Sequence, residues 1–286
     1  MAFIGLDIGG TKFLVASADR AGTILRSVQV PTPQNLEEGL TLLKTMARDV
    51  AAGATVEAIG ASCGGPLDPF KGIVSPLHQP EWLQVPLREM FESEFHCPFR
   101  VEVDTDAAVL AEYRFGPERP DRLLYLTLST GMGGGFLING EIYRGECGVH
   151  PEAGHQAIPY RLRNHTGPVR CSCGAEGCLE ELVSGNGIFR LYGKKAEQLG
   201  DEEWAEVGHN LGMGLRNLAV LYAPNVVVLG GGVVTGSGPR FLPTAEKVMR
   251  EGLRLVPPPR LTVSSLGYHT ALLGAIALAQ DCIRKT

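Results

Sequence analysis

The sequence predicts an α/β protein with two domains, and three observations support this. The chain has 286 residues, a length that suits two medium domains better than one small core. Apolar runs of strand length alternate with segments of helical periodicity. A glycine-rich turn between two apolar runs occurs near the N-terminus and again after residue 122, which suggests an internal duplication.

The composition points away from nucleic acids and membranes. The formal net charge is −5, from 26 basic and 31 acidic residues, and neither sign forms a long run, so neither a nucleic-acid tail nor a membrane patch is indicated. No apolar stretch reaches the roughly 18 residues of a membrane span, and the N-terminus lacks the pattern of a signal peptide. We expect a cytoplasmic protein with small-molecule partners, no nucleic acid and no membrane.

The first half of the chain predicts a hairpin, a third strand, a helix and a buried strand. Residues 3–19, FIGLDIGGTKFLVASAD, are two apolar runs around a glycine turn, the pattern of a β-hairpin. A strand is expected at 24–30 and a helix at 36–52, and VEAIGASCGG then ends in a glycine loop. After a short helix at 87–95, FRVEVDTDAAVLAEYRFG predicts a strand running into a helix through an acidic corner. We expect the first domain to span 1–112.

The second half repeats this theme. RLLYLTLSTGMGGGFLINGEIYRG predicts three strands separated by turns, and a cysteine-rich segment follows. Helices are expected through GHNLGMGLRNLAVLYA, and NVVVLGGGVV predicts a strand that runs into three glycines. We expect a larger C-terminal domain at 113–271 that carries the cysteine segment, with a closing helix at about 272–286 that packs back on the first domain.

The first glycine turn has the chemistry of a phosphate site. Gly9 and Gly10 let the backbone approach a ligand closely, while Thr11 and Lys12 supply a hydroxyl and a positive charge. Asp7, at the end of a strand beside such a loop, is placed to hold Mg²⁺, through water. The alternative is a hairpin turn that needs no ligand.

Two further glycine turns could complete a nucleotide site. Ser129–Gly135 offers Thr130, Gly131 and Gly133 from the second domain, and Gly231 with Gly232 would lie near the base or ribose. A strand-to-helix turn without a ligand is the alternative for the last pair. None of these segments fits the P-loop or the dinucleotide fingerprint, so both of those folds are disfavoured.

The acidic corner offers a general base. Asp104, at the end of VEV, could accept a proton from a substrate hydroxyl. Asp106 competes for this role, and one of the two could instead cap the helix that begins near Ala107. We assign the base to Asp104 and the cap to Asp106.

The cysteine segment predicts a metal site. Cys171, Cys173 and Cys178 with His155 offer three sulfurs and one imidazole, the ligand set of a closed structural Zn²⁺ site. His165, inside the loop, is a rival fourth ligand. Free cysteines and redox chemistry are the alternatives, and redox lacks its usual C-x-x-C spacing. The other cysteines are expected to be scattered small apolar residues: Cys63, Cys97, Cys147 and Cys282.

In this order, the segments DIGGTK, SCGGPLDP, VDTDAA, LSTGMGGG, PEAGH, CSCGAEGCLE and VVVLGGGV resemble the ROK family of sugar kinases, within the sugar kinase, Hsp70 and actin superfamily. The resemblance covers nearly the whole chain. It implies two ribonuclease-H-like domains of the actin-like ATPase type facing across a nucleotide and sugar cleft. It also implies ATP with Mg²⁺, phosphorylation of a hexose hydroxyl, and a homodimer or, less commonly, a tetramer.

The resemblance also assigns residues. Asp104 would be the general base, and Lys12, Thr11, Thr130 and Gly131 would contact phosphates. The residues that would contact the sugar are Gly65, His78, Asp104, Glu152, His155 and Glu180. His155 would then serve two partners, because one ring nitrogen can coordinate Zn²⁺ while the other donates to a hydroxyl.

Two departures from the family pattern concern the sugar. Most glucokinase-like members have E-N-D-A-N at the acidic corner, where this chain has Val103 before Asp104, and His78 stands where the family commonly has asparagine. The expected acceptor is glucose or an N-acyl hexosamine, with fructose or mannose as alternatives. A non-catalytic sugar sensor is the alternative from another class. The repressors of that class carry an N-terminal helix-turn-helix, whereas here the first strand is expected within a few residues of Met1.

Overall fold

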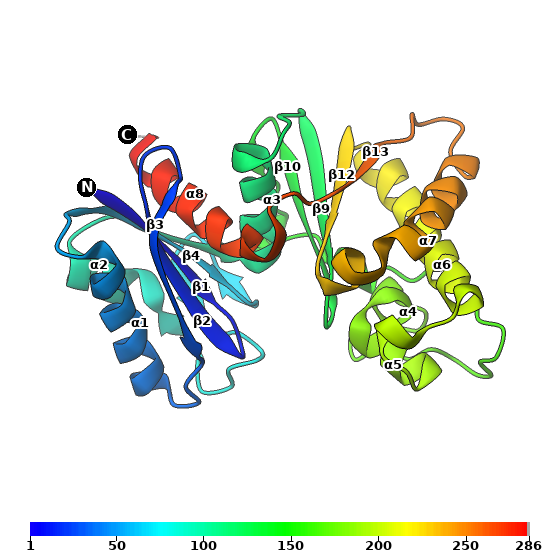
Figure 1. Cartoon of the computed structure of the whole chain (residues 1–286), viewed down its shortest axis with the longest axis horizontal. Helices are drawn as coiled ribbons and strands as arrows, with labels where there is room; N and C mark the ends of the chain where they lie inside the picture. The colour runs from blue at the N-terminus through cyan, green and yellow to red at the C-terminus, as the bar shows by residue number, and fades with distance from the viewer. Residues whose placement is uncertain (285–286) are drawn as a thin grey trace. The chain divides into compact units, whose positions relative to one another are not determined.

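The computed structural model describes residues 1–284 and divides the chain into two compact units (Figure 1). The first unit comprises Met1–Arg119, Ile142–His150 and the C-terminal stretch from Tyr268, and the second comprises Pro120–Glu141 and Pro151–Gly267. The predicted α/β class is confirmed. The segments 113–119 and 142–150, which the sequence placed in the second domain, group with the first unit, because helix α3 continues to Phe115 and Arg144 pairs with Glu102.

The first unit is built on a five-stranded sheet of order β3-β2-β1-β4-β8. The hairpin β1 (Ala2–Ile8) and β2 (Lys12–Ala18) is antiparallel, and β3 (Ile24–Pro31) continues it. Strands β4 (Val56–Cys63) and β8 (Phe99–Val103) are parallel to β1. The carboxyl ends of β1, β4 and β8 therefore meet at one edge, where Asp7 lies and Asp104 follows.

Helices cover both faces of this sheet. Helix α1 (Leu36–Ala51) packs on β1 and β2, and α2 (Leu87–Phe95) packs on β8. Helix α8 (Thr270–Arg284) contacts β1, β4 and α3 (Asp104–Phe115). The end of the predicted closing helix, 285–286, lies outside the described residues. A small sheet of β5 (Leu67–Asp68), β6 (Ile73–Val74) and β7 (Val85–Pro86) follows β4.

The second unit contains a sheet with the same pattern of directions, of order β11-β10-β9-β12-β13. Strands β9 (Arg122–Leu128) and β10 (Met132–Ile138) form an antiparallel hairpin, while β12 (Val226–Gly230) and β13 (Arg260–Val263) run parallel to β9. The short edge strand β11 is Glu141–Ile142. The repeated order agrees with the duplication expected from the two glycine-rich hairpins.

The helices of the second unit are α4 (Leu179–Val183), α5 (Gly185–Tyr192), α6 (Asp201–Tyr222) and α7 (Gly232–Glu251). Helices α6 and α7 pack against each other, with the ring of Trp204 stacked on Phe241. In both units together, the described residues include four short 3₁₀ turns: Glu146–Gly148, Ala153–His155, Ala196–Gln198 and Gly267–His269. Among residues 1–284, no helix combines the length and the apolar character that crossing a bilayer requires.

Candidate active site

The first predicted phosphate loop is the tight turn between β1 and β2. The Gly9 amide donates to the Lys12 carbonyl at 3.1 Å. The end of β3 braces the turn, because the Thr32 hydroxyl donates to the Gly9 carbonyl at 2.6 Å and the Thr32 amide donates to the Thr11 carbonyl. Gly10 and Thr11 thus lie at the tip of a turn whose shape is held by hydrogen bonds within the unit.

Two carboxylates lie close together beside this loop. Asp7 is near the end of β1, and Asp104 is an exposed residue at the start of α3. Burial and the negative charge of Asp104 raise the pKa of Asp7 to about 6. The Ser62 hydroxyl, which donates to Asp7 at 3.3 Å, and the positive charge of Lys12 both act in the opposite direction and lower this pKa. Paired hard oxygen donors of this kind suit Mg²⁺.

The assignment of Asp106 as a helix cap is wrong. Helix α3 begins at Asp104 and its N-cap is Val103, so Asp106 lies inside the first turn. Its side chain is buried, and its Oδ1 has no hydrogen-bond partner among the described residues. Because the strand ends at Val103, Asp104 is the residue that the corner exposes.

The sugar-side residues predicted in the first unit gather around the same loop. A Cβ built on Gly65 would lie 4.0 Å from Cγ2 of Val103, and the Gly65 carbonyl accepts from the Leu77 amide at 3.1 Å. A Cβ on Gly10 would come within 2.6 Å of Cβ of His78. The structure therefore brings Gly65, Val103 and His78 to the edge that carries Asp104.

Lys12 rests on an aromatic ring that sequence reasoning missed. Its Nζ lies 3.7 Å from the centroid of the Tyr268 ring, a cation–π contact within the first unit. Tyr268 is 63% exposed and precedes α8, so neither burial nor spacing in the sequence marks it.

The second predicted phosphate loop is a shorter turn than the sequence suggested. The turn consists of Ser129–Gly131, closed by the Ser129 amide donating to the Gly131 carbonyl at 2.9 Å. Gly133 is not in this turn, because it lies in β10 opposite Thr127. Glu180 braces the turn, since its Oε2 accepts from the Met132 amide at 2.8 Å.

A cavity of about 540 Å³ in the second unit joins two of the predicted glycine turns. Its walls include Ser129 and Thr130 from the first turn, and Gly232 at the start of α7. Gly231, the N-cap of α7, has a φ of +91° and leaves no room for a Cβ, which would stand 2.3 Å from the Leu128 carbonyl oxygen. This close approach brings α7 against the end of β9.

Other walls of this cavity were not predicted. They are Asn186, Phe189 and Lys195, from α5 and the segment after it. An adjoining cavity of about 360 Å³ shares Thr130 and Asn186 and adds Glu180 with two arginines, Arg170 and Arg190. These residues are dispersed over the segment 170–195, and no motif spacing identifies them.

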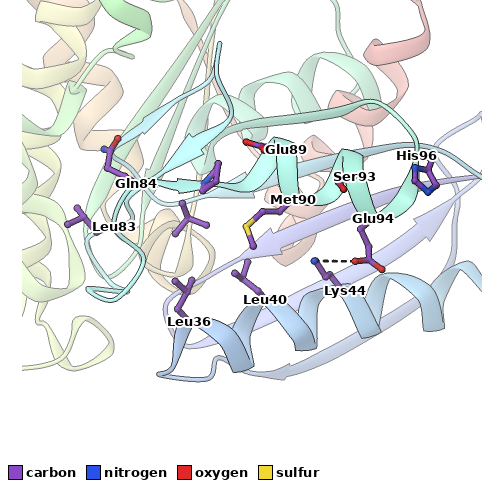
Figure 2. A pocket seen from close by; sticks show the side chains of 12 residues that line it. Leu36, Leu40, Lys44, Leu83, Gln84, Glu89, Met90, Ser93, Glu94 and His96 are labelled. Atoms are coloured by element: carbon purple, nitrogen blue, oxygen red, sulfur yellow. Dashed lines mark hydrogen bonds and ion pairs between the residues drawn. The ribbon is translucent and has the colours of Figure 1, made fainter.

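A third cavity lies away from these groups. It measures about 740 Å³ and is lined by residues of α1, β7 and α2, including Leu40 and Met90 and the ion pair of Lys44 with Glu94 (Figure 2). It contains no glycine turn and none of the predicted site residues, so we assign it no part in the site.

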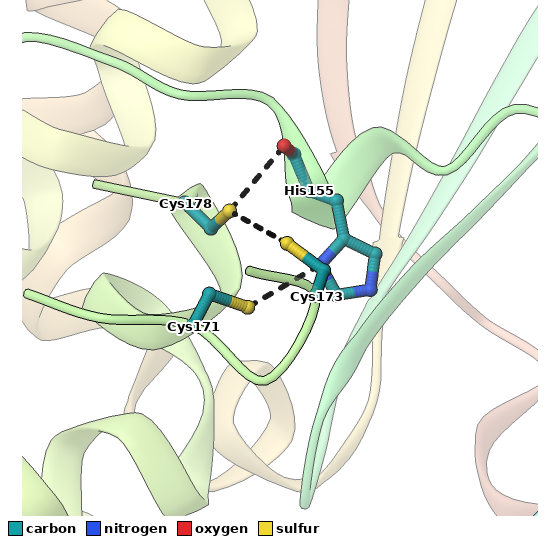
Figure 3. A group of neighbouring side chains, drawn as sticks. All are labelled: His155, Cys171, Cys173 and Cys178. Carbon is teal, nitrogen blue, oxygen red and sulfur yellow. Dashed lines mark hydrogen bonds between the residues drawn. The ribbon is translucent and has the colours of Figure 1, made fainter. Parts of the chain in front are cut away.

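The four predicted metal ligands meet in one cluster (Figure 3). The ligand atoms of His155, Cys171, Cys173 and Cys178 all lie within 4.8 Å of one another. Sγ of Cys173 is 3.5 Å from Sγ of Cys178, and Sγ of Cys171 is 3.5 Å from Nδ1 of His155. A tetrahedral Zn²⁺ with Zn–S bonds of about 2.3 Å needs sulfurs roughly 3.8 Å apart, so the donor set and spacing fit a structural zinc.

His165 takes no part in this cluster. It lines a separate cavity with Tyr192 and Glu206, and its Nε2 is buried without a hydrogen-bond partner in the described chain. The geometry therefore favours His155 over its rival.

The turn that carries His155 lies beside Glu180, which accepts from the Met132 amide after the second glycine turn. His155 ends the 3₁₀ turn that follows Glu152, and its Nδ1 faces Cys171, so Nε2 on the other side of the ring points away from the sulfurs (Figure 3). A Cβ on Gly154 would lie 3.3 Å from Cβ of Glu180. Glu180 and the turn carrying His155 are thus neighbours.

The remaining cysteines mostly behave as predicted. Cys63 and Cys97 are buried, and burial raises the pKa of the Cys63 thiol, as do the charges of Asp104 and Asp7. Cys147 is the exception: it is exposed and has a φ of +57° in a loop, so it is not a core residue.

Comparisons with known proteins agree with this geometry. The family model described as the ROK family matches residues 3–282. A glucokinase of Streptomyces coelicolor is 29% identical over 97% of each chain. The crystal structure of a ROK hexokinase from Thermus thermophilus superposes with a TM-score of 0.87 at 33% identity over 100% of both chains. A ROK family glucokinase from Streptomyces griseus, in complex with glucose and AMPPNP, gives 0.79 at 29% identity over 98% of this chain and 100% of the other.

The family match at residues 3–282 includes this chain's three glycine turns, its acidic corner and its cysteine cluster. The chain belongs to the ROK family.

Proposed function

We propose that the protein is a sugar kinase that transfers the terminal phosphoryl group of ATP to a hydroxyl of a hexose. The observation that carries this proposal is the exposed Asp104 beside Asp7 and the Lys12 loop. A base, a cation-binding carboxylate and a phosphate loop are the parts that phosphoryl transfer needs, since the protein mainly positions groups and neutralises charge. The glucokinase and hexokinase relatives support the same reaction.

In the proposed mechanism, Asp104 accepts the proton of the attacking hydroxyl as its oxygen bonds to the terminal phosphorus and the bond to ADP breaks. Lys12, Thr11, Thr130 and Gly131 are the groups we assign to the phosphates. Asp7 would hold Mg²⁺ through water, and the ion would supply positive charge for the phosphate oxygens. With a pKa of about 6, Asp7 is ionised at neutral pH.

The nucleotide is assigned to the second unit. The cavity of about 540 Å³ has two glycine turns in its walls and is large enough for a small ligand. Phe189 offers an aromatic face for a base, and Lys195 offers a positive charge. The adjoining cavity with Glu180 is assigned to the side where the phosphates meet the sugar.

We also propose that the cysteine cluster holds a structural Zn²⁺. The ion would occupy all four ligand atoms, leave no position for a substrate, and fix the turn that carries Glu152 and His155. The positive φ values of Gly174 and Gly177, +94° and +72°, support the tight turns that aim the thiolates at one point.

Glucose or an N-acyl hexosamine is the proposed acceptor. Fructose or mannose is the alternative, because Val103 offers no side-chain hydrogen bond where most glucokinase-like members have asparagine. The test is a coupled assay of ADP release with purified protein, Mg²⁺ and ATP across a panel of hexoses and hexosamines. Sugar-dependent ADP release supports the kinase. Binding of a sugar without any turnover would instead identify a sugar sensor.

A further inference from the structure

The segment Ile142–His150 groups with the first unit, although Glu141 before it and Pro151 after it belong to the second. It leads directly to Glu152, which is assigned to the sugar. Its internal shape is a pair of turns, in which the Gly145 amide donates to the Val149 carbonyl at 2.8 Å and the Val149 amide donates to the Glu146 carbonyl. What holds this segment to the first unit therefore bears on the start of the sugar-binding turn.

The first attachment is an ion pair to the strand that precedes the acidic corner. Arg144 of the segment pairs with Glu102, two residues before Asp104. Glu102 is 2% exposed, and its other basic neighbour is Arg100 at 3.4 Å. Because breaking a buried pair leaves a buried charge uncompensated, this contact is costly to remove.

The second attachment involves the last residue of the segment. Burial raises the pKa of Asp106 to about 7. The charge of His150 is the largest influence in the opposite direction, because it favours the ionised form of Asp106. Asp106 is 1% exposed and lies two residues after Asp104, inside the first turn of α3. The charge of His150 thus acts on the buried carboxyl group that the sequence had assigned as a cap.

An apolar contact completes the attachment. A Cβ on Gly148 would come within 3.0 Å of the Phe70 ring, and the guanidinium of Arg144 lies 6.0 Å from the centroid of that ring. Phe70 belongs to the turn after β5 and is held there by Arg88, which donates to the Phe70 and Pro69 carbonyls. The segment thus has contacts to two parts of the first unit.

We propose that Arg144 and His150 are positioning residues that fix the 142–150 segment to the corner carrying Asp104, and so hold the start of the turn that carries Glu152. This inference rests on the proposed function for its kinetic test. It predicts that loosening the segment weakens use of the sugar, while use of ATP is spared, because the nucleotide is assigned to other residues.

The test compares Arg144→Met with the matched variant Arg114→Met. Arg114 lies near the C-terminal end of α3, in the same unit, and pairs with Asp281 of α8. It is partly buried like Arg144, but within the part of the chain that the structure describes no ion pair or hydrogen bond joins it to the 142–150 segment. We expect Arg144→Met to lower kcat/KM for the hexose about 10- to 100-fold, with KM for ATP within about twofold. Arg114→Met should leave both within about twofold, even where both variants lose similar melting temperature.

An equal hexose kcat/KM in the two variants would overturn the proposal. Should Arg144→Met fail to fold, His150→Gln replaces it, since His150 is only partly buried. This variant should lower hexose kcat/KM about 3- to 10-fold, and an unchanged value would count equally against the proposal.

Hydrogen exchange separates this proposal from the kinase assignment. Wild-type turnover alone tests the kinase, whereas amide exchange of residues 142–150 tests the attachment without any substrate. We expect faster exchange there in Arg144→Met than in Arg114→Met. Equal exchange would show that the ion pair does not hold the segment, whatever the enzyme's activity.

Discussion

Glu180 is expected to serve two partners at once, and two substitutions separate them. Its Oε2 accepts the Met132 amide at 2.8 Å and so braces the second phosphate loop. Its other oxygen, Oε1, is the one that we assign to a sugar hydroxyl. Glu180→Gln keeps one oxygen for the amide but offers the sugar an NH₂ group, whereas Glu180→Ala removes both acceptors.

The structure sets the size of each effect. A hydrogen bond to a charged group contributes about 1.5–3 kcal/mol, and about 1.4 kcal/mol is tenfold, so both variants should lose roughly 10- to 150-fold in kcat/KM for the hexose. Met132 is 4% exposed, and a buried amide without an acceptor costs about 1–3 kcal/mol. Only the alanine variant should therefore also raise KM for ATP, by about tenfold.

The assay is ADP release with either substrate varied while the other is saturating, and the control is Glu176→Gln, at an exposed glutamate of the cysteine segment. A rise in KM for ATP that is as large for glutamine as for alanine would refute the bracing role. A hexose kcat/KM unchanged by glutamine would refute the sugar contact.

Three further predictions concern zinc, Lys12 and pH. His155→Ala should lower bound zinc by elemental analysis, whereas His165→Ala should keep it; the reverse result would move the fourth ligand to His165. Tyr268→Leu should raise KM for ATP about two- to fivefold, the cost of an exposed cation–π contact with Lys12, and Tyr268→Phe should not. Equal KM values for ATP in the two variants would show that the aromatic ring does not support Lys12. Since the pKa of Asp106 rises from 3.8 to about 7, the folded chain keeps a proton that the unfolded chain releases between these values, and stability falls as pH rises. The melting temperature of Asp106→Asn should therefore rise relative to that of wild type between about pH 5 and pH 8. A difference in melting temperature that stays constant over this range would contradict this.

The repeated hairpins and the cysteine cluster could be predicted from the sequence because their signals are local. Two apolar runs around a glycine turn predict β1 and β2, and the structure has that hairpin at Ala2–Ala18. Thiolates at Cys171, Cys173 and Cys178 need only a few tight turns to meet, so short spacing predicts the cluster that the structure contains.

The groups that depend on contacts distant in sequence could not be predicted in this way. Asp106 is a residue type that often caps helices, but the helix begins two residues earlier, at Asp104, and tertiary packing buries the Asp106 side chain. The 142–150 segment joins the first unit through Arg144 and Glu102, 42 residues apart. The walls of the cavity that we assign to the nucleotide, such as Phe189, are set by where α5 packs, which no motif encodes.

In the proposed reaction, Asp104 removes the proton of a hexose hydroxyl as that hydroxyl attacks ATP. Single-turnover transfer from γ-labelled ATP to the hexose, compared between wild type and Asp104→Asn, tests it most directly. We predict labelled sugar phosphate with wild type and a rate about 10² to 10⁴ lower in the variant, with nucleotide affinity retained. Transfer at the wild-type rate in Asp104→Asn would contradict the claim and assign the base elsewhere.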